Sequence, residues 1–402
     1  MFQGDAFMVL KLNHPESKEN ILKNKLRNKS RVLNHLPLIR KNVNNIRRGK
    51  MIGIGLIEFH CTDYCDLNCF YCTYRSRDPF HFPYNKLNKI LDLNPKGIVI
   101  SGGGEPTLYP SGRHSFADLI NYFKVKNKDI KLGLTTNGAF VPRGDWKKNL
   151  SWIRISIDAS TENTFKSLKD GEYQTRMNTL LEYLCEPIPY VGVGFVYNRF
   201  NITEIASFIE KIFYFVSNNL GTAYLDKLNI QFRPCCPIQS CICPSPRYHE
   251  YSILMTPDML TWWRNSMKEE IRRIETLRKH KLIKNFIDKN TNFWELLVVS
   301  KIKTMPKFNN CYLSLIRFLI RANGNIYPCV MKASNKTPPI GNLLKDDLGM
   351  INHRQKGFYR LDSTLCLGAT SCCRLDGIKN SIIEAHYTLS RTYSIEDMDP
   401  FF

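Results

Sequence analysis

The sequence predicts an α/β fold: a partial (β/α)6 barrel of the TIM type, followed by a helical connector and a small α+β domain. Three observations support this prediction. Six short apolar runs alternate with longer amphipathic segments in residues 51–250, a charged helix-like stretch fills residues 251–306, and short strands with a second group of cysteines occupy residues 307–402. Strands that alternate with helices are typical of repeated βαβ units around a parallel sheet.

The elements follow in order along the chain. Residues 1–50 form a basic extension with twelve Lys and Arg against three Asp and Glu, and their irregular apolar spacing predicts no core of their own. Residues 51–250 hold the barrel, whose strands are predicted in the runs IGLIEFHC, GIVISGGG, KLGLTTNG, WIRISIDAS, YVGVGFVYN and LNIQFRPCC. Each run ends in small or polar residues, and the working site of parallel α/β folds lies at those strand ends.

The two C-terminal regions have their own local signals. In the connector, Thr256 stands where a helix N-cap is expected and Pro257 at the first helical position. In the last region, the segment NGNIYPC predicts a turn between two short strands.

Composition narrows the class of protein. The chain has 402 residues and 43% hydrophobic content, and its apolar runs are far shorter than the roughly 20 residues that cross a bilayer. The N-terminus lacks the basic segment and cleavage site of a secretory signal, so we expect a cytoplasmic protein without a membrane partner. Fourteen cysteines in such a chain indicate metal or cluster binding rather than a disulfide scaffold.

The formal net charge of +21 has two interpretations. A basic chain is typical of proteins that bind nucleic acid. The chain is also rich in Lys, Asn and Ile together, so the charge is explained by composition alone, and we do not expect nucleic acid as a partner. The same field would suit an acidic peptide segment or a negatively charged small molecule.

Four cysteines are crowded into the stretch CTDYCDLNCFYC, which follows the first predicted strand. A structural zinc site normally has two cysteine pairs joined by a longer loop, and no second pair lies nearby. The trio Cys65, Cys69 and Cys72 instead has the spacing C-x3-C-x2-C, whereas Cys61 falls outside it. Three thiolates on a cubane cluster leave one iron open to a substrate or cofactor.

This stretch resembles the signature of the radical S-adenosylmethionine enzymes, including the aromatic Tyr71 before the last cysteine. The resemblance covers roughly residues 54–235, because GGGEP, TTNG and SIDAS follow in the expected order. It implies a [4Fe-4S] cluster on the cysteine trio, and S-adenosylmethionine bound to the open iron.

The resemblance also implies a set of cofactor-binding residues. GGGEP is similar to the segment that holds the methionine amino group, SIDAS to the one that contacts ribose and carboxylate, and TTNG closes the third strand. Lys169 stands about where relatives often carry an arginine that reaches the cofactor carboxylate. The residues expected to bind S-adenosylmethionine are Tyr71, Gly103, Gly104, Glu105, Asn137, Ser156 and Asp158.

The C-terminal cysteines resemble the auxiliary-cluster domain called SPASM, or its shorter form, Twitch. The spacing Cys311-x12-Gly324-x4-Cys329 fits the first half of that pattern, and IGNLL follows, but the second half is short of cysteines. The resemblance therefore implies one auxiliary [4Fe-4S] cluster, with a zinc-stapled hairpin as the alternative. Its ligands are expected to be Cys311, Cys329, Cys366 and either Cys372 or Cys373.

The remaining cysteines leave several roles open. Cys61 either packs at the end of the first strand or faces the reaction chamber. The segment RPCCPIQSCIC, with Cys235, Cys236, Cys241 and Cys243, lies just after the sixth predicted strand. Its cysteines ligate a further centre, donate a hydrogen atom to a substrate radical, or serve structure only. The candidate catalytic residues are thus Cys61, Cys235 and Cys236.

The resemblance implies an oxidoreductase that cleaves S-adenosylmethionine to a 5′-deoxyadenosyl radical and abstracts hydrogen from its substrate. The leading hypothesis is oxidation or cross-linking of a peptide or protein, as in peptide maturases, with electrons from a flavodoxin- or ferredoxin-type donor. The alternative is dehydrogenation or rearrangement of a small polar molecule, such as an amino sugar or a nucleotide-linked sugar. A zinc-containing nucleic-acid-binding protein is the hypothesis from a different class.

Overall fold

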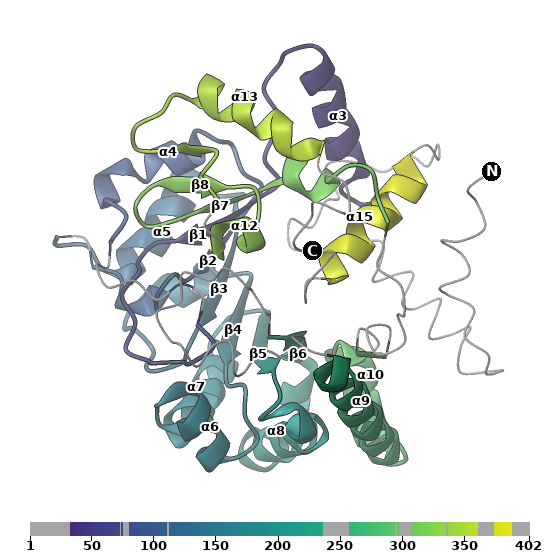
Figure 1. Cartoon of the computed structure of the whole chain (residues 1–402). Coiled ribbons are helices and arrows are strands. Elements are labelled where there is room, and N and C mark those ends of the chain that lie inside the picture. The colour runs from purple at the N-terminus through teal and green to yellow at the C-terminus, as the bar shows by residue number, and fades with distance from the viewer. Residues whose placement is uncertain are drawn as a thin grey trace.

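A nine-stranded sheet forms the centre of the molecule, which we describe from a computed structural model (Figure 1). The structure describes residues 33–72, 74, 80–110, 112–235, 257–293, 296–297, 307–334, 337–360 and 374–387. The strands are β1 (Leu56–His60), β2 (Gly97–Ser101), β3 (Lys131–Thr136), β4 (Trp152–Ser156), β5 (Tyr190–Tyr197), β6 (Leu228–Pro234), β7 (Arg317–Ile320), β8 (Asn325–Tyr327) and β9 (Gly341–Asn342). Their order across the sheet is β6-β5-β4-β3-β2-β1-β7-β8-β9.

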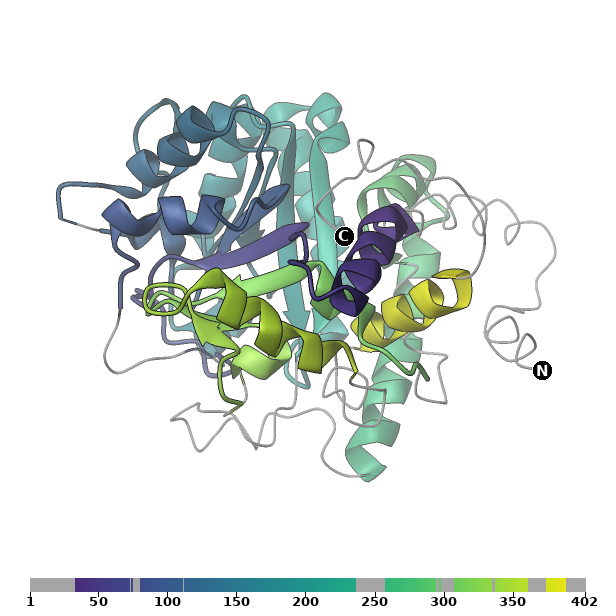
Figure 2. The same ribbon diagram turned by 90° about the horizontal axis from the view of Figure 1, so that it is seen from above.

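Helices join the strands and cover one face of the sheet (Figures 1 and 2). The helices of the barrel are α4 (Asn88–Leu91), α5 (Phe116–Lys126), α6 (Glu162–Lys169), α7 (Tyr173–Cys185) and α8 (Ile205–Leu220). The other helices that the argument uses are α3 (Leu36–Arg47), α9 (Pro257–Leu277), α10 (Lys281–Asn290), α12 (Val330–Ser334), α13 (Leu348–Tyr359), α15 (Arg374–Tyr387) and the short 3-10 helix η7 (Tyr312–Leu315). None of the described helices is both long and apolar enough to cross a membrane.

The predicted α/β fold with an open partial barrel is confirmed. All six runs predicted as barrel strands contain one, and β1 to β6 pair in parallel with their neighbours. Among the described strands, β6 and β9 form the two edges, so the sheet does not close. The connector helix α9 begins at Pro257, as predicted, whereas its predicted N-cap Thr256 lies outside the described residues.

The two faces of the sheet differ in chemistry because side chains alternate along a strand. In β1, Ile57 and Phe59 are fully buried in the main hydrophobic core. Glu58 and His60 point to the opposite, concave face, and the parallel register places Ser101 of β2 beside His60. The apolar side chains of β1 therefore anchor the sheet to its helices, and its polar side chains lie on the concave face.

The C-terminal region continues the barrel sheet. Strand β7 pairs in parallel with β1, from Leu56 opposite Arg317 to Phe59 opposite Ile320. The turn predicted in NGNIYPC is confirmed, because β7 and β8 form an antiparallel hairpin and Gly324 has a φ of +84°. The hairpin that lies between Cys311 and Cys329 thus pairs with the first barrel strand, an arrangement that the sequence did not predict.

A second hydrophobic cluster joins the two ends of the described chain. Helix α3 lies beside α15 in both views, and Arg40 donates a hydrogen bond to the carbonyl of Tyr387 at 3.0 Å (Figures 1 and 2). The N-terminal extension therefore shares a core with the C-terminal region. The buried members of this cluster are Leu33, Leu36, Leu38, Ile39, Val43, Tyr312, Leu313, Leu315, Ile316 and Ile383.

Candidate active site

The loop that carries the first three predicted ligands starts directly after β1 and lies against the end of β2. Gly104 N–H donates to the carbonyl of Thr62 at 2.9 Å, and Glu105 N–H donates to the carbonyl of Tyr64 at 2.7 Å. A Cβ atom on Gly104 would lie 2.0 Å from the carbonyl oxygen of Tyr64, and one on Gly103 would lie 2.2 Å from Asp63 Oδ1. The glycines are needed because the loop backbone packs directly on them.

The other side of the loop is held by the end of α6. Asn68 N–H donates to the carbonyl of Lys169 and Phe70 N–H to the carbonyl of Leu168, both at 3.3 Å. The loop is therefore held between the end of β2 and the end of α6.

The three thiols of the loop lie near its surface. Cys65 is exposed, whereas Cys69 and Cys72 are partly buried. Burial raises the pKa of the Cys69 thiol to about 12, while the ammonium of Lys169 opposes this and the neighbouring thiols add to it. The pKa of Cys65 is raised to about 12 by the same desolvation, with smaller contributions from the carboxylates and from Cys72. Each thiol therefore acts electrostatically on the others.

The donor set fits an iron–sulfur cluster better than a single metal ion. Within the described residues, no three Cys, His, Asp or Glu side chains lie close enough to hold one ion. The thiolates of a cluster bind different iron atoms and stand farther apart than the ligands of one ion. Thiolates are the usual ligands of such clusters, and a thiol of high pKa loses its proton when it binds metal.

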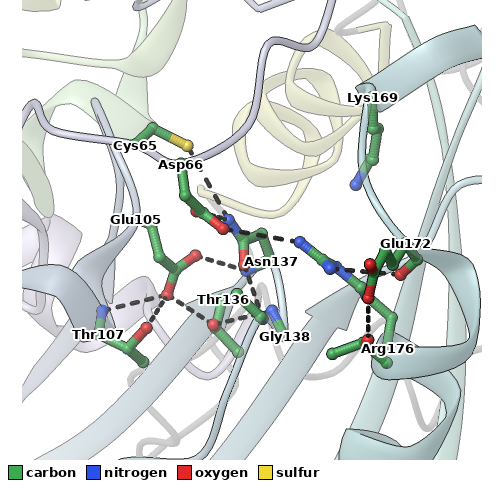
Figure 3. A network of polar contacts seen from close by, with 12 residues as sticks. Cys65, Asp66, Glu105, Thr107, Thr136, Asn137, Gly138, Lys169, Glu172 and Arg176 are labelled. Carbon is green, nitrogen blue, oxygen red and sulfur yellow. Dashed lines mark hydrogen bonds and ion pairs between the residues drawn. The ribbon is translucent and has the colours of Figure 1, made fainter. Parts of the chain in front are cut away.

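Glu105 is buried at the centre of a polar network (Figure 3). Its Oε1 accepts hydrogen bonds from Thr107 N–H at 3.1 Å, Thr107 Oγ1 at 2.7 Å and Thr136 Oγ1 at 2.6 Å. Its Oε2 accepts one from Asn137 N–H at 2.6 Å. Burial raises the pKa of Glu105, and these donors offset part of the effect. Oε1 already accepts three hydrogen bonds, whereas Oε2 accepts one and has about two lone pairs, which leaves room on Oε2 for one further donor.

Asn137 connects this network to the cysteine loop. Its side-chain amide donates to Asp66 Oδ1 at 2.6 Å and to Cys65 Sγ at 3.9 Å. Asp66 forms an ion pair with Arg176 of α7 at 3.7 Å (Figure 3). The sequence identified Asn137 but missed the other two. Asp66 lies within the cysteine signature and could have been found there, whereas no local signal marks Arg176.

Asp158 holds the opposite side of the loop. Tyr71 Oη donates to Asp158 Oδ2 at 2.6 Å, Lys169 Nζ lies 2.6 Å from the same oxygen, and Val196 N–H donates to Oδ1 at 2.5 Å. The side chain of Asp158 does not follow the alternation of strand β4. Strand β4 ends at Ser156, and Asp158 has a φ of +63°, so the strand alternation has stopped before it.

Two of the three candidate catalytic cysteines are described. Cys61 is completely buried in the main core, and its thiol donates to the carbonyl of Pro106 at 3.9 Å. Burial, with Glu105 and Asp63 nearby, raises its pKa well above the ordinary value. Of the two roles expected for Cys61, the structure therefore favours packing. Cys235 directly follows β6 and lies in the same core, 7% exposed. Cys236, Cys241 and Cys243 lie outside the described residues.

One polar group on the concave face was not predicted. Glu58 Oε1 accepts a hydrogen bond from Ser101 Oγ at 2.9 Å, and His60 Nε2 lies 3.5 Å from the same atom. Burial raises the pKa of Glu58, but His60, Ser101 and the charge of Arg317 more than offset this and lower it. An ionised carboxylate therefore faces the inside of the partial barrel.

Cys311 and Cys329 are the described members of the second cysteine set. Cys311 is the residue before η7, and Cys329 is the residue before α12; both are partly buried. Tyr74, two residues after Cys72, donates from its hydroxyl to the carbonyl of Val330 at 3.2 Å. The region of Cys329 is thus linked to the first cysteine loop. Cys366, Cys372 and Cys373 lie outside the described residues.

Comparison with known proteins agrees with this arrangement. Residues 59–212 match the family model described as the radical SAM superfamily, so this part of the chain is a radical SAM domain. No curated protein matches the sequence.

Solved structures share the fold. SuiB of Streptococcus suis bound to S-adenosylmethionine is 16% identical, with a TM-score of 0.53 over 86% of this chain and 73% of that one. The same enzyme bound to its precursor peptide SuiA is 15% identical, with a TM-score of 0.52 over 77% and 67%. The anSMEcpe structure with AdoMet and the Cp18Cys peptide is 16% identical, with a TM-score of 0.50 over 83% and 96%.

Proposed function

We propose that this protein is a radical S-adenosylmethionine oxidoreductase that oxidises or cross-links a peptide or protein substrate. Cys65, Cys69 and Cys72 would hold its [4Fe-4S] cluster. When bound, such a cluster supplies the electron that cleaves S-adenosylmethionine to methionine and a 5′-deoxyadenosyl radical. The observation that carries the proposal is the clamped cysteine loop at the carboxyl ends of β1, β2 and β4, within a matched radical SAM domain.

The chain's own residues would orient the cofactor. Gly103 and Gly104 shape the floor under the loop, and the open acceptor position on Glu105 Oε2 suits the ammonium of the methionine moiety. Asp158 is saturated by Tyr71, Lys169 and Val196, so in this conformation it positions the loop through Tyr71. Ser156, half-buried at the end of β4, is the group left to meet the ribose.

A peptide substrate is supported by two structural neighbours, which are SuiB bound to the precursor peptide SuiA and anSMEcpe bound to the Cp18Cys peptide. Because their identity to this chain is 15–16%, they support the fold alone, and the substrate class is our proposal. On the concave face, the partly exposed Glu58, which accepts a hydrogen bond from the buried Ser101, offers a polar group that a backbone or a polar side chain would contact.

We further propose an auxiliary [4Fe-4S] cluster on Cys311, Cys329, Cys366 and one of Cys372 and Cys373. Cys311 and Cys329 flank a hairpin that joins the barrel sheet beside β1. The other proposed ligands, Cys366 and one of Cys372 and Cys373, are inferred from the sequence spacing. Such a cluster would accept an electron when the substrate is oxidised. We further propose that the protein is cytoplasmic and receives its electrons from a flavodoxin- or ferredoxin-type donor.

The test compares a triple variant with a matched control in protein purified without oxygen. Replacing Cys65, Cys69 and Cys72 by Ala should abolish the formation of 5′-deoxyadenosine from S-adenosylmethionine and dithionite, and should lower bound iron. Cys185→Ala removes an exposed thiol at the end of α7, and we expect it to change neither quantity. Bound zinc without iron, together with no 5′-deoxyadenosine from the unaltered protein, would refute the proposal that the protein is a radical S-adenosylmethionine enzyme.

The substrate class needs a separate readout. Peptides encoded beside the gene, incubated with enzyme and S-adenosylmethionine, should show a mass loss of hydrogen by mass spectrometry. If peptides stay unchanged while a small amino sugar or nucleotide-linked sugar is dehydrogenated, the peptide assignment is wrong and the radical chemistry stands.

A further inference from the structure

Cys311 is held by three separate segments of the chain. Its N–H donates to the carbonyl of Tyr359, the last residue of α13, at 2.9 Å, and its own carbonyl accepts from Ser314 Oγ at 2.7 Å. The 3-10 helix η7 that follows it is packed in the hydrophobic cluster shared by α3 and α15. The position of the Cys311 backbone is therefore fixed by tertiary contacts.

One side chain contacts that sulfur directly. Asn380 of α15 is 1% exposed, and its Nδ2 donates to Cys311 Sγ at 3.6 Å. Its Oδ1 accepts from Leu313 N–H at 3.1 Å, which fixes the orientation of the amide. A buried amide whose oxygen is already engaged can present only its N–H groups to the sulfur.

We propose that Asn380 is a positioning residue that sets the reduction potential of the auxiliary cluster through the Cys311 sulfur. The inference rests on the auxiliary cluster of the proposed function. Hydrogen bonds to the ligand sulfurs are among the factors that set the potential of an iron–sulfur cluster. Reduction adds negative charge, and a donor to the sulfur stabilises that charge, so Asn380 raises the potential and makes the cluster a better electron acceptor.

The experiment isolates the auxiliary cluster in the full-length chain. The Cys65, Cys69 and Cys72 triple Ala variant removes the other proposed cluster, and the protein is then reconstituted with iron and sulfide. Midpoint potentials are measured by redox titration followed by electron paramagnetic resonance. Asn380→Asp keeps the oxygen that receives Leu313 N–H but removes the donor and adds a charge. Asn380→Leu removes the donor without adding a charge.

Ser381→Asp is the control for charge, because it adds a carboxylate one residue along α15 and leaves the Asn380 amide in place. We expect Asn380→Leu to lower the equilibrium constant for reduction of the auxiliary cluster about tenfold. For a one-electron couple this is a shift of the midpoint potential by about 59 mV to more negative values, and Asn380→Asp should shift it further. Ser381→Asp should stay near the parent value. Loss of iron in Asn380→Asp, with iron retained in Ser381→Asp, would equally place the donor at the cluster.

Two outcomes overturn the inference, and they are distinguishable. If both Asn380 variants keep their iron and the parent potential, the role of Asn380 is wrong while the auxiliary cluster stands. If the triple Ala parent binds no iron after reconstitution, the auxiliary cluster itself is wrong and the role of Asn380 falls with it. The first cluster, assayed in the unaltered protein, is unaffected by either result.

Discussion

The buried ion pair of Lys169 and Asp158 gives the sharpest prediction about stability. Lys169 is 2% exposed and Asp158 is 1% exposed, and Lys169 Nζ lies 2.6 Å from Asp158 Oδ2. The same ammonium donates to the carbonyl of Ser156 at 2.6 Å. Replacing Lys169 by Met keeps an unbranched side chain one atom shorter but leaves the Asp158 charge buried, with the donors Tyr71 Oη and Val196 N–H left to compensate it.

Breaking a buried pair in this way costs about 3–5 kcal/mol. That is a large share of the roughly 5–15 kcal/mol by which a folded domain is stable. Lys169→Met should therefore lower the free energy of unfolding of the cluster-free protein by several kcal/mol, measured by urea denaturation at neutral pH. The double variant Lys169→Met with Asp158→Asn removes both charges and should recover part of the loss, because the buried carboxylate is then gone.

The matched control is Lys166→Met on the same helix. Lys166 pairs with Asp170 at 2.9 Å, but these side chains are 67% and 59% exposed, so the loss should lie within about 1 kcal/mol. If Lys169→Met proves no more destabilising than Lys166→Met, the buried pair does not hold this side of the cysteine loop and our reasoning is refuted.

Three further predictions test the loop and the barrel wall. Gly104→Ala should strongly reduce iron incorporation, because its Cβ would meet the carbonyl of Tyr64 at 2.0 Å, whereas Gly357→Ala, with nothing within 4 Å, should leave iron content unchanged. Tyr71→Phe removes one hydrogen bond to a buried carboxylate and should cost about 1.5–3 kcal/mol of unfolding free energy in urea denaturation; a cost near zero would contradict the clamp. The lowered pKa of Glu58 contributes stability that is present above its unfolded value near 4.5 and is lost as pH falls below it. Glu58→Gln should flatten the acid limb of the stability profile, and identical profiles would show that the carboxylate is not held.

The barrel was predictable because its signals are local. Each strand is a short apolar run that ends in small or polar residues, and β1 to β6 appear at all six predicted positions. The continuation of the sheet by β7 was not predictable, because the pairing of Leu56 with Arg317 joins residues that are far apart in the sequence. The same is true of α3 and α15, whose contact depends on a cluster drawn from both ends of the chain.

The cysteine spacing identified the trio, but what fixes it in space lies elsewhere in the sequence. The glycines of GGGEP, which we expected to approach a ligand, are in close contact with the loop backbone at Asp63 and Tyr64. Asp158, which we expected to reach the ribose, is directed inward to Tyr71 and Lys169. These motif residues therefore hold the cysteine loop in place, and the cofactor would bind to a loop that is already fixed from both sides.

This clamp explains why Cys61 stands apart from the other three cysteines. Cys61 directly follows β1 and donates to the carbonyl of Pro106, inside the core on which the loop rests. Cys65, Cys69 and Cys72 belong to the loop, where the sulfurs remain near the surface between the ends of β2 and α6. A thiol buried in the core cannot reach a cluster held at that surface without breaking the packing of β1. In the proposed cluster, Cys65, Cys69 and Cys72 would therefore be ligands and Cys61 would not, which agrees with three ligands and one open iron.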